Sequence, residues 1–204
     1  MTSLLALALI CPTPVEGITD FFPLNVGDSW IYAEESENFE LRTIDTVGDA
    51  VEREGGIRMI PVITTRDNKE LDRVYYQLGE GQVSVVAFKA DKPLLTPYPI
   101  LISPDMKSSW KHKGETFMQG ELTDVSMEGH VKKGSVEWNG KKIDSLEVRL
   151  EATLMESFGT PYKVSQVATY GRGVGLIKME STTKLPKRSL KMTRRLVEYR
   201  PKTT

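Results

Sequence analysis

Three glycines spaced two residues apart, Gly171, Gly173 and Gly175, stand in the stretch YGRGVGLIKME. A glycine-rich loop binds phosphate when its backbone N–H groups and the N-terminus of a following helix converge on the anion. That chemistry uses the spacing G-x-G-x-x-G, whereas the spacing here is G-x-G-x-G. The residues that follow, LIKMESTTK, alternate and predict a strand instead of a helix. We therefore interpret the three glycines as a bend between two strands and expect no nucleotide there.

Two histidines and one cysteine are the other residues with catalytic or metal-binding chemistry. His112 and His130 lie in WKHKG and EGHVKKG, beside predicted turns, which indicates exposed loop histidines. A zinc site needs three or four ligands, and Glu115 and Glu128 are the acids that a hairpin would bring to them, without a characteristic spacing. No G-x-S-x-G nucleophile motif is present. We expect no catalytic residue, no metal and no cofactor; a hydrolase, the alternative, requires a histidine, a carboxylate and a nucleophile within hydrogen-bond reach.

The N-terminus predicts export. Residues 3–10, SLLALALI, form an apolar run too short to span a bilayer but similar in length to a signal-peptide core, although no Lys or Arg precedes it. Cys11 directly follows this run, as a lipidated bacterial cysteine would, while Ile10 is bulkier than the small residue typical of that position. We expect residues 1–20 to be an export segment, with Cys11 as a lipidation candidate. The protein would then reach the periplasm, the outer surface or the medium, and would contact a membrane only through that lipid anchor.

Composition and charge describe an ordinary folded domain. The chain has 204 residues, 39% of them hydrophobic and 27% charged, which excludes wholesale disorder. The formal net charge of −1 gives no overall attraction to nucleic acid. Acidic residues dominate residues 16–56, however, and basic residues dominate residues 178–202. The basic stretch has two interpretations, a nucleic-acid patch or a last strand that lies beside the first and balances its charge, and we favour the second.

Strand-like segments fill the rest of the chain. They are short, rich in Val, Ile, Thr and Tyr, and separated by turn residues. In DSLEVRLEATL the apolar residues from Leu146 to Leu154 fall on one face and the polar residues on the other, which indicates a strand buried on one side. We predict an all-β fold with little helix, an antiparallel sheet of about ten strands curved into a half-barrel or a barrel-like meander. Residues 21–204 are expected to form one β domain.

This domain has a weak internal similarity. FPLNVGDSW (residues 22–30) is similar to ISPDMKSSW (residues 102–110), which either duplication or chance would produce. The stretch between the two halves, residues 91–104, contains four prolines, and these exclude a central strand. We expect it to be an extended crossover that runs over one end of the sheet and joins two half-units.

The aromatic residues suit either a packed core or the wall of a ligand site. Core packing is the simpler interpretation, because aromatic side chains dominate burial. The core is expected to contain Trp30, Trp110, Trp138, Leu146, Val148 and Leu150. A curved sheet of this size can also enclose an apolar groove. The groove residues that we predict are Leu94, Leu95, Tyr98, Ile100, Leu101, Trp110 and Trp138.

Three stretches of the chain resemble elements of uncharacterised exported bacterial proteins, many of them lipoproteins. They are FFPLNVGDSWIY, YYQLGEGQVSVV and YGRGVGLIKME, which resemble the patterns FPLxxGxxWxY, a Tyr-x-Leu strand and YxxGVGLxK. Gly171-Arg172 departs from the usual small residue and proline, and EWNGKKIDSLEV stands where a Pro-Ala-Gly-Thr-Phe stretch is usual. The resemblance implies an exported domain without an assigned activity and carries no catalytic residues.

Together these observations favour non-catalytic binding. The first hypothesis is an exported β domain that binds a lipid, an acyl chain or an exposed peptide on the concave side of its sheet. The alternative is a structural or protein-interaction module of the bacterial cell envelope, filled by side chains and without a ligand cavity. The expected partners are accordingly an apolar small molecule or an envelope protein, and not nucleic acid.

Overall fold

The computed structural model describes residues 17–37, 39–53, 56–118, 121–155, 161–185 and 187–202. Cys11 and most of the expected export segment lie outside these residues. Within the described part of the chain, no helix has the length and apolar character that crossing a membrane requires.

Strands make up most of the described chain, and its one described helix is a single turn. The elements are α1 (Ile18–Phe21), β1 (Ser29–Ser36), β2 (Phe39–Val47), β3 (Val51–Arg53), β4 (Ile57–Arg66), β5 (Lys69–Gly79), β6 (Gln82–Lys89), β7 (Lys92–Ile102), β8 (Ser109–Met118), β9 (Glu121–Trp138), β10 (Lys141–Met155), β11 (Tyr162–Gly171), β12 (Gly175–Leu185) and β13 (Arg188–Arg200). The all-β prediction is confirmed, although the described residues form more strands than the ten or so expected.

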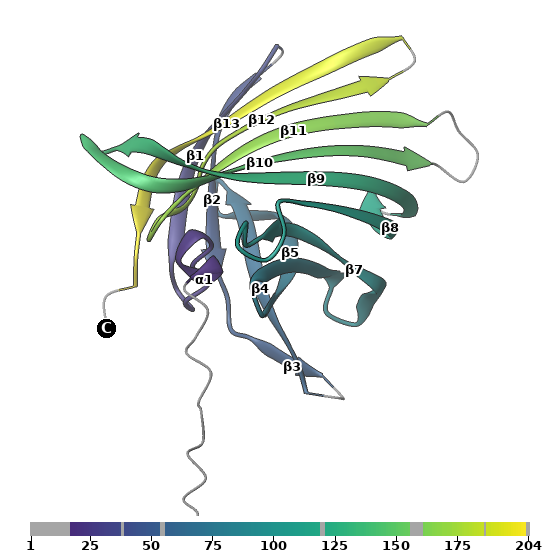
Figure 1. Cartoon of the computed structure of the whole chain (residues 1–204), viewed down its shortest axis with the longest axis horizontal. Helices are drawn as coiled ribbons and strands as arrows, with labels where there is room; N and C mark the ends of the chain where they lie inside the picture. Colours follow the sequence, from purple (N-terminus) through teal and green to yellow (C-terminus); the bar gives the residue numbers. More distant parts are fainter. Residues whose placement is uncertain are drawn as a thin grey trace, which may run out of the picture.

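The two ends of the domain meet in the middle of the sheet. Hydrogen bonds join the strands in the order β7-β6-β5-β4-β2-β1-β13-β12-β11-β10-β9-β8, with β3 off this path and paired with β4. One arm therefore runs from β1 to β7 and the other from β13 back to β8, and Figure 1 shows the two arms curving toward each other into a nearly closed barrel. The predicted neighbourhood of the first and last strands is confirmed, because Glu34 on β1 lies directly opposite Arg194 on β13.

The Pro-rich stretch forms an edge strand, which corrects the prediction of an extended crossover. It is β7, which pairs with β6 through several register shifts, and its prolines lack the N–H that a second neighbouring strand would need. The other edge, β8, lies beside it without a hydrogen-bonded ladder. A side-chain hydrogen bond joins the two edges instead, since Thr116 Oγ1 donates to Tyr98 Oη at 3.3 Å. The edges also approach closely at Gly114, where an added Cβ would lie 3.1 Å from Thr96 Cβ.

The glycine run is a bend between strands, as predicted. It connects β11 to β12, and Gly173 and Gly175 adopt positive φ angles of 72° and 93°. The bend also anchors the N-terminal helix, since the Gly173 amide donates to the carbonyl of Asp20 at 2.6 Å. On the opposite side Trp30 Nε1 donates to the carbonyl of Val174 at 2.6 Å. The glycines thus hold α1 and β1 against the end of β12.

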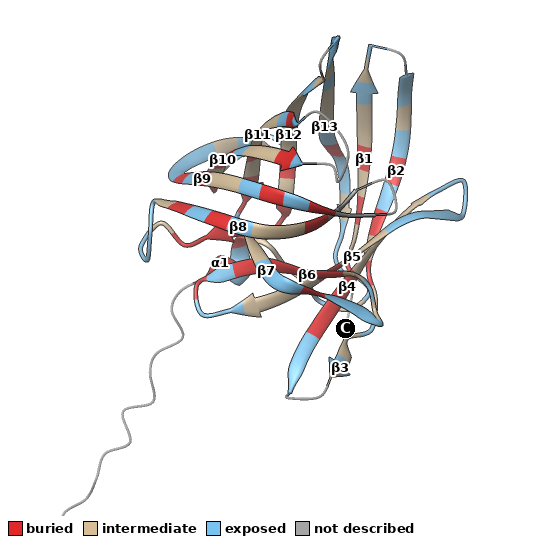
Figure 2. Cartoon of the chain, turned by 90° about the vertical axis from the view of Figure 1, so that its right-hand side faces the viewer, coloured by how far each residue is buried: buried red, intermediate tan, exposed pale blue. Residues whose placement is uncertain are grey.

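Buried residues alternate with exposed ones along the strands, most visibly on β8 and β9 (Figure 2). Five predicted core positions are confirmed as buried: Trp30, Trp110, Leu146, Val148 and Leu150. Trp138 is only partly buried and packs at the margin of the cluster that contains Trp30. On β10 the alternation places Leu150 and Leu154 on the inner face of the sheet, where they line a cavity.

Replacing Gly175 by alanine is expected to lower the free energy of unfolding by about 2–3 kcal/mol. Besides the positive φ, the new Cβ would lie 3.3 Å from Trp30 Nε1 and 3.4 Å from Pro23 Cδ. Gly173→Ala is the matched control in the same turn, because its Cβ would have no atom within 4 Å and only the backbone conformation is penalised, by about 1 kcal/mol. Urea unfolding measures both variants, and equal losses would contradict the close packing at Gly175.

Candidate functional site

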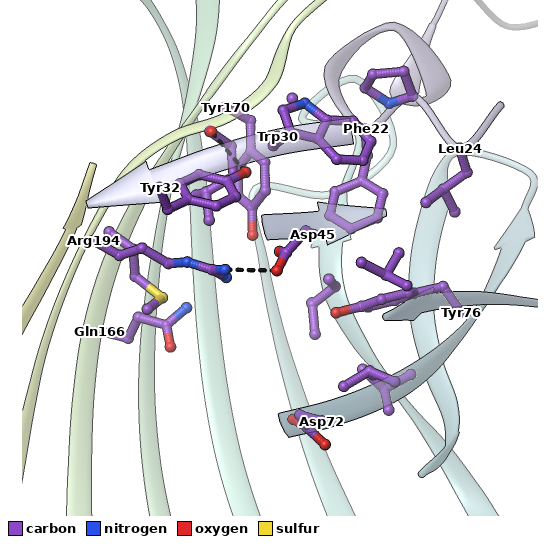
Figure 3. A pocket seen from close by; sticks show the side chains of 18 of the residues that line it. Phe22, Leu24, Trp30, Tyr32, Asp45, Asp72, Tyr76, Gln166, Tyr170 and Arg194 are labelled. Atoms are coloured by element: carbon purple, nitrogen blue, oxygen red, sulfur yellow. Dashed lines mark hydrogen bonds and ion pairs between the residues drawn. The ribbon is translucent and has the colours of Figure 1, made fainter. Parts of the chain in front are cut away.

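A cavity of about 410 Å³ lies inside the curved sheet. Both arms contribute to its wall, with residues from β1, β2, β4, β5, β6 and β7 on one side and from β11, β12 and β13 on the other. Figure 3 shows aromatic rings at one end of the cavity and a charged group beneath them. The cavity is thus formed by the two arms of the sheet, is partly open to solvent, and is not a hollow between two loops.

More than half of the lining residues come from the three stretches that resemble elements of exported bacterial proteins. FFPLNVGDSWIY contributes Phe22, Pro23, Leu24, Trp30 and Tyr32; YYQLGEGQVSVV contributes Tyr76 and Val85; YGRGVGLIKME contributes Tyr170, Gly175, Leu176 and Met179. These stretches are far apart in the sequence, yet the sheet topology places all three around one space.

Aromatic contacts close one end of the cavity. The Phe22 ring lies between two tyrosines, with centroid distances of 5.1 Å to Tyr76 and 5.8 Å to Tyr170, both tilted. Trp30 is fixed by its hydrogen bond to the glycine bend and by stacking on Tyr199 at 5.4 Å. Tyr32 Oη donates to the carbonyl of Leu176 at 3.1 Å. These contacts hold the rings in place, which makes this end a preformed wall.

A buried ion cluster occupies the centre of the wall. Arg194 Nη2 on β13 lies 2.7 Å from Asp45 Oδ1 on β2, and its Nε lies 3.0 Å from Glu34 Oε1 on β1 without hydrogen-bond geometry. The guanidinium also stacks over the Tyr32 ring at 3.9 Å. Thr43 Oγ1 donates to Glu34 Oε1 at 2.7 Å. Three adjacent strands are thus joined by one cation and two carboxylates.

Burial and the neighbouring charges shift the pKa of Arg194 in opposite directions. Burial by itself would lower the pKa of Arg194, but the nearby Asp45 carboxylate raises that pKa above its ordinary value, so the guanidinium stays charged. Burial raises the pKa values of Tyr32, Tyr76 and Tyr170 above that of an ordinary tyrosine. Their hydroxyls are therefore protonated at neutral pH and can donate hydrogen bonds.

Only some of the predicted groove residues line the cavity; the others lie in the core, in a separate hollow or at the surface. Tyr98 and Ile100 line the cavity. Leu101 and Trp110 are buried in the largest core cluster, and Leu94 lines a separate hollow between β4, β6 and β7. The remaining two are Leu95, whose exposed fraction is 86%, and Trp138, which is partly buried in the second core cluster.

The histidines lie in strands, which corrects the prediction of exposed loop positions. His112 on β8 is buried, 5.8 Å from the Tyr98 ring, whereas His130 on β9 is exposed, with its Nε2 3.4 Å from Glu128 Oε1. Alternation along the paired strands places the two histidines on opposite faces of the sheet. Among the described residues no group of three or more His, Cys, Asp or Glu is placed to hold a metal ion.

Sequence reasoning missed the ion cluster and left the aromatic residues undecided between a packed core and the wall of a ligand site. Arg194 and Asp45 are 149 residues apart, and each occurs in a stretch that looks like an ordinary charged strand face. One signal was present: the acidic first strands and the basic last strand predicted their own pairing. The three motifs were a second signal, since their apolar residues surround the cavity.

No protein-family model matches the chain, and no curated protein matches it. Two solved structures are similar. A protein named "putative lipoprotein" from Parabacteroides distasonis has a TM-score of 0.55 at 11% identity, with 88% of this chain and 98% of that chain covered. A "putative exported protein with YmcC-like fold" from Bacteroides fragilis has a TM-score of 0.46 at the same identity and coverage. The first similarity shows a shared fold.

The free energy of unfolding is expected to decrease as the pH falls from about 7.5 to about 5.5, in part because of His112. Burial lowers the pKa of His112 below its ordinary value of 6.5, so the unfolded chain takes up the proton more readily. The stability that this residue contributes is present above pH 6.5 and is lost as the pH falls toward the lowered pKa.

His112→Gln should therefore reduce the pH dependence of the urea midpoint. An identical pH dependence in wild type and His112→Gln would show that His112 is not desolvated.

Proposed function

We propose that this chain is a non-catalytic binding domain that holds an apolar or amphiphilic small molecule inside its curved sheet. The observation that supports this most is the cavity of about 410 Å³, which the three motif stretches surround. Its size lies within the range of small-molecule sites, and its wall combines many apolar and aromatic side chains with a few polar groups, as such sites do.

The cavity favours this function over the alternative of an interaction module filled by side chains. A filled module needs no internal space, and an unfilled cavity reduces stability because its lining loses packing contacts. A fold that keeps this space lined by fixed aromatic rings is better explained by a ligand that occupies it. The described lining residues include no His, Cys, Ser, Thr or Lys, which also favours binding over nucleophilic catalysis.

We also propose that the domain is exported. The apolar run at residues 3–10 supports this, as does the shared fold with a protein named "putative lipoprotein". Export would place the cavity among cell-envelope lipids, which are the most abundant apolar small molecules of that compartment. Cys11 is the residue that would carry a lipid anchor.

Filling the cavity should weaken binding. Met179 on β12 lines it, and Met179→Trp adds bulk at that point, so the affinity for the fluorescent apolar dye N-phenyl-1-naphthylamine should fall at least about tenfold. Glu180→Trp is the matched control, since it places the same side chain on the exposed face of the same strand. Fluorescence titration of the purified domain measures the affinity, with thermal melting as a check that each variant folds.

Native mass spectrometry of the wild-type domain complements this titration by showing any co-purified lipid. The proposal is contradicted if the wild type neither takes up the dye nor carries a lipid, or if Met179→Trp binds the dye as well as the wild type does.

Mapping the mature N-terminus in fractionated cells tests export. Peptide mass spectrometry is expected to find a chain that begins after residue 10 in the envelope or the medium, with a lipid mass on Cys11 if that residue is the anchor. An intact N-terminus in the cytoplasmic fraction would contradict export.

A further inference from the structure

The cation in the cavity wall is already paired with two carboxylates. Arg194 contacts Asp45 and Glu34 at 2.7 and 3.0 Å and covers the Tyr32 ring. A buried arginine without a carboxylate partner would be a receptor for a carboxylate or phosphate, but the charge of this one is already matched by two carboxylates. Arg194 therefore offsets only part of the negative charge of the wall and is a poor receptor for an anionic ligand.

Around the cavity, negatively charged side chains outnumber positively charged ones in the described part of the chain. Arg194 carries the one positive charge among the described lining residues, whereas Asp45 and Asp72 also line the cavity and Glu34 lies directly behind it. An anionic head group that lost its water here would lie close to Asp45, whose buried position strengthens the repulsion because the local dielectric is low. The wall therefore disfavours fatty acids and other anionic amphiphiles.

The polar groups of the wall that still lack a hydrogen-bond partner within the described chain are suited to a ligand that donates hydrogen bonds. Tyr170 is 5% exposed, and neither its hydroxyl nor that of Tyr76 has a hydrogen-bond partner among the described residues. Asp45 uses Oδ1 for its bonds to Arg194 and to Thr64, which leaves Oδ2 for another donor. Figure 3 shows both tyrosine hydroxyls and Asp45 directed into the same space.

A second, more apolar cavity adjoins the first. It measures about 250 Å³ and shares Tyr98 and Gln166 with the main cavity. Apart from Thr116 on β8, its other lining residues are apolar and lie on β9, β10 and β11: Val125, Met127, Leu150, Ala152, Leu154 and Val164. Tyr98 and Gln166 thus lie at the boundary between the polar centre and an apolar pocket.

From these observations we infer that the site selects an amphiphile with a single alkyl chain and a head group that donates hydrogen bonds and bears no negative charge. The head, an alcohol or an amine, binds at Asp45, Tyr76 and Tyr170, and the chain extends toward Ala152. This inference rests on the proposed binding function and adds the chemical class of the ligand.

Three dodecyl compounds that differ only in their heads test it: dodecylamine, dodecanol and sodium dodecanoate. Each competes with N-phenyl-1-naphthylamine for the wild-type domain at about pH 8, where dodecanoate is ionised and dodecylamine is largely protonated. The amine and the alcohol are expected to displace the dye at concentrations about tenfold or more below that of dodecanoate, because of the repulsion from the carboxylates. All concentrations stay below the onset of micelles.

Two variants connect the selectivity to the named carboxylates. Asp45→Asn and Asp72→Asn each remove one negative charge and keep the side-chain shape, so each should narrow the preference for the amine over dodecanoate. Because Asp72 is exposed at the rim, Asp72→Asn should fold even if Asp45→Asn does not, and it then still tests the selectivity. Glu180→Gln is the control on the outer face of β12 and should leave the preference unchanged.

A variant of the second cavity tests the position of the chain. In the wild type the affinity of alkylamines should rise from hexyl to dodecyl, by up to about fourfold for each methylene group buried. Ala152→Phe fills the second cavity and should stop this rise, with hexylamine binding unchanged.

Dodecanoate binding as tightly as dodecylamine, or an unchanged preference in both aspartate variants, would overturn the inference while the binding function remained. If the domain takes up neither the dye nor any of the three compounds, the proposed function itself fails.

Discussion

The contact on which the rest of the structure depends is the ion cluster where the first and last strands of the sheet meet. Arg194 on β13 reaches Glu34 on β1 and Asp45 on β2, so a single side chain joins three adjacent strands from inside the barrel. A buried guanidinium is costly unless it is paired, and a buried carboxylate is equally so. The cluster therefore favours the one register of β1 and β13 in which these residues meet, and that register sets how both arms curve.

The glycine bend and the short helix complete the wall that the ion cluster begins. Gly173 binds the backbone of α1, Val174 accepts a hydrogen bond from Trp30, and Gly175 lets Trp30 and Pro23 approach. A run that looks like a phosphate loop is thus the place where two distant segments are held against the end of β12. The Gly173 amide and the Val174 carbonyl make hydrogen bonds within the protein there, and the aromatic rings face the cavity.

The sequence predicted the parts of the fold that depend on local patterns. The alternation from Leu146 to Leu154 identified β10, and the glycine spacing identified the bend. Strand β8 was missed because His112 and Thr116 lie on its buried face, so polar residues occupy inward positions and obscure the alternation. The edge strand β7 was missed because prolines argue against pairing, yet an edge strand needs pairing on one side only.

The site could be predicted only in part, because it forms between residues that are distant in the sequence. The Pro-rich stretch was expected to line a groove, and Tyr98 and Ile100 do line the cavity, but which other side chains meet them depends on how the two arms curve. The charge of the cavity wall could not be predicted from the sequence either. It follows from the pairing of Arg194 with two carboxylates, and neither contact is visible in the charge pattern of any single segment.

A double-mutant cycle between Arg194 and Asp45 tests the central claim most directly. The free energy of unfolding in urea would be measured for Arg194→Gln, Asp45→Asn, the double variant and the wild type. The ion cluster predicts that the double variant loses less stability than the two single losses added together, by about 1 kcal/mol or more, because each single change leaves a charge buried without its partner. Losses that add to within about 0.3 kcal/mol would show that the two charges are not coupled and would contradict the account.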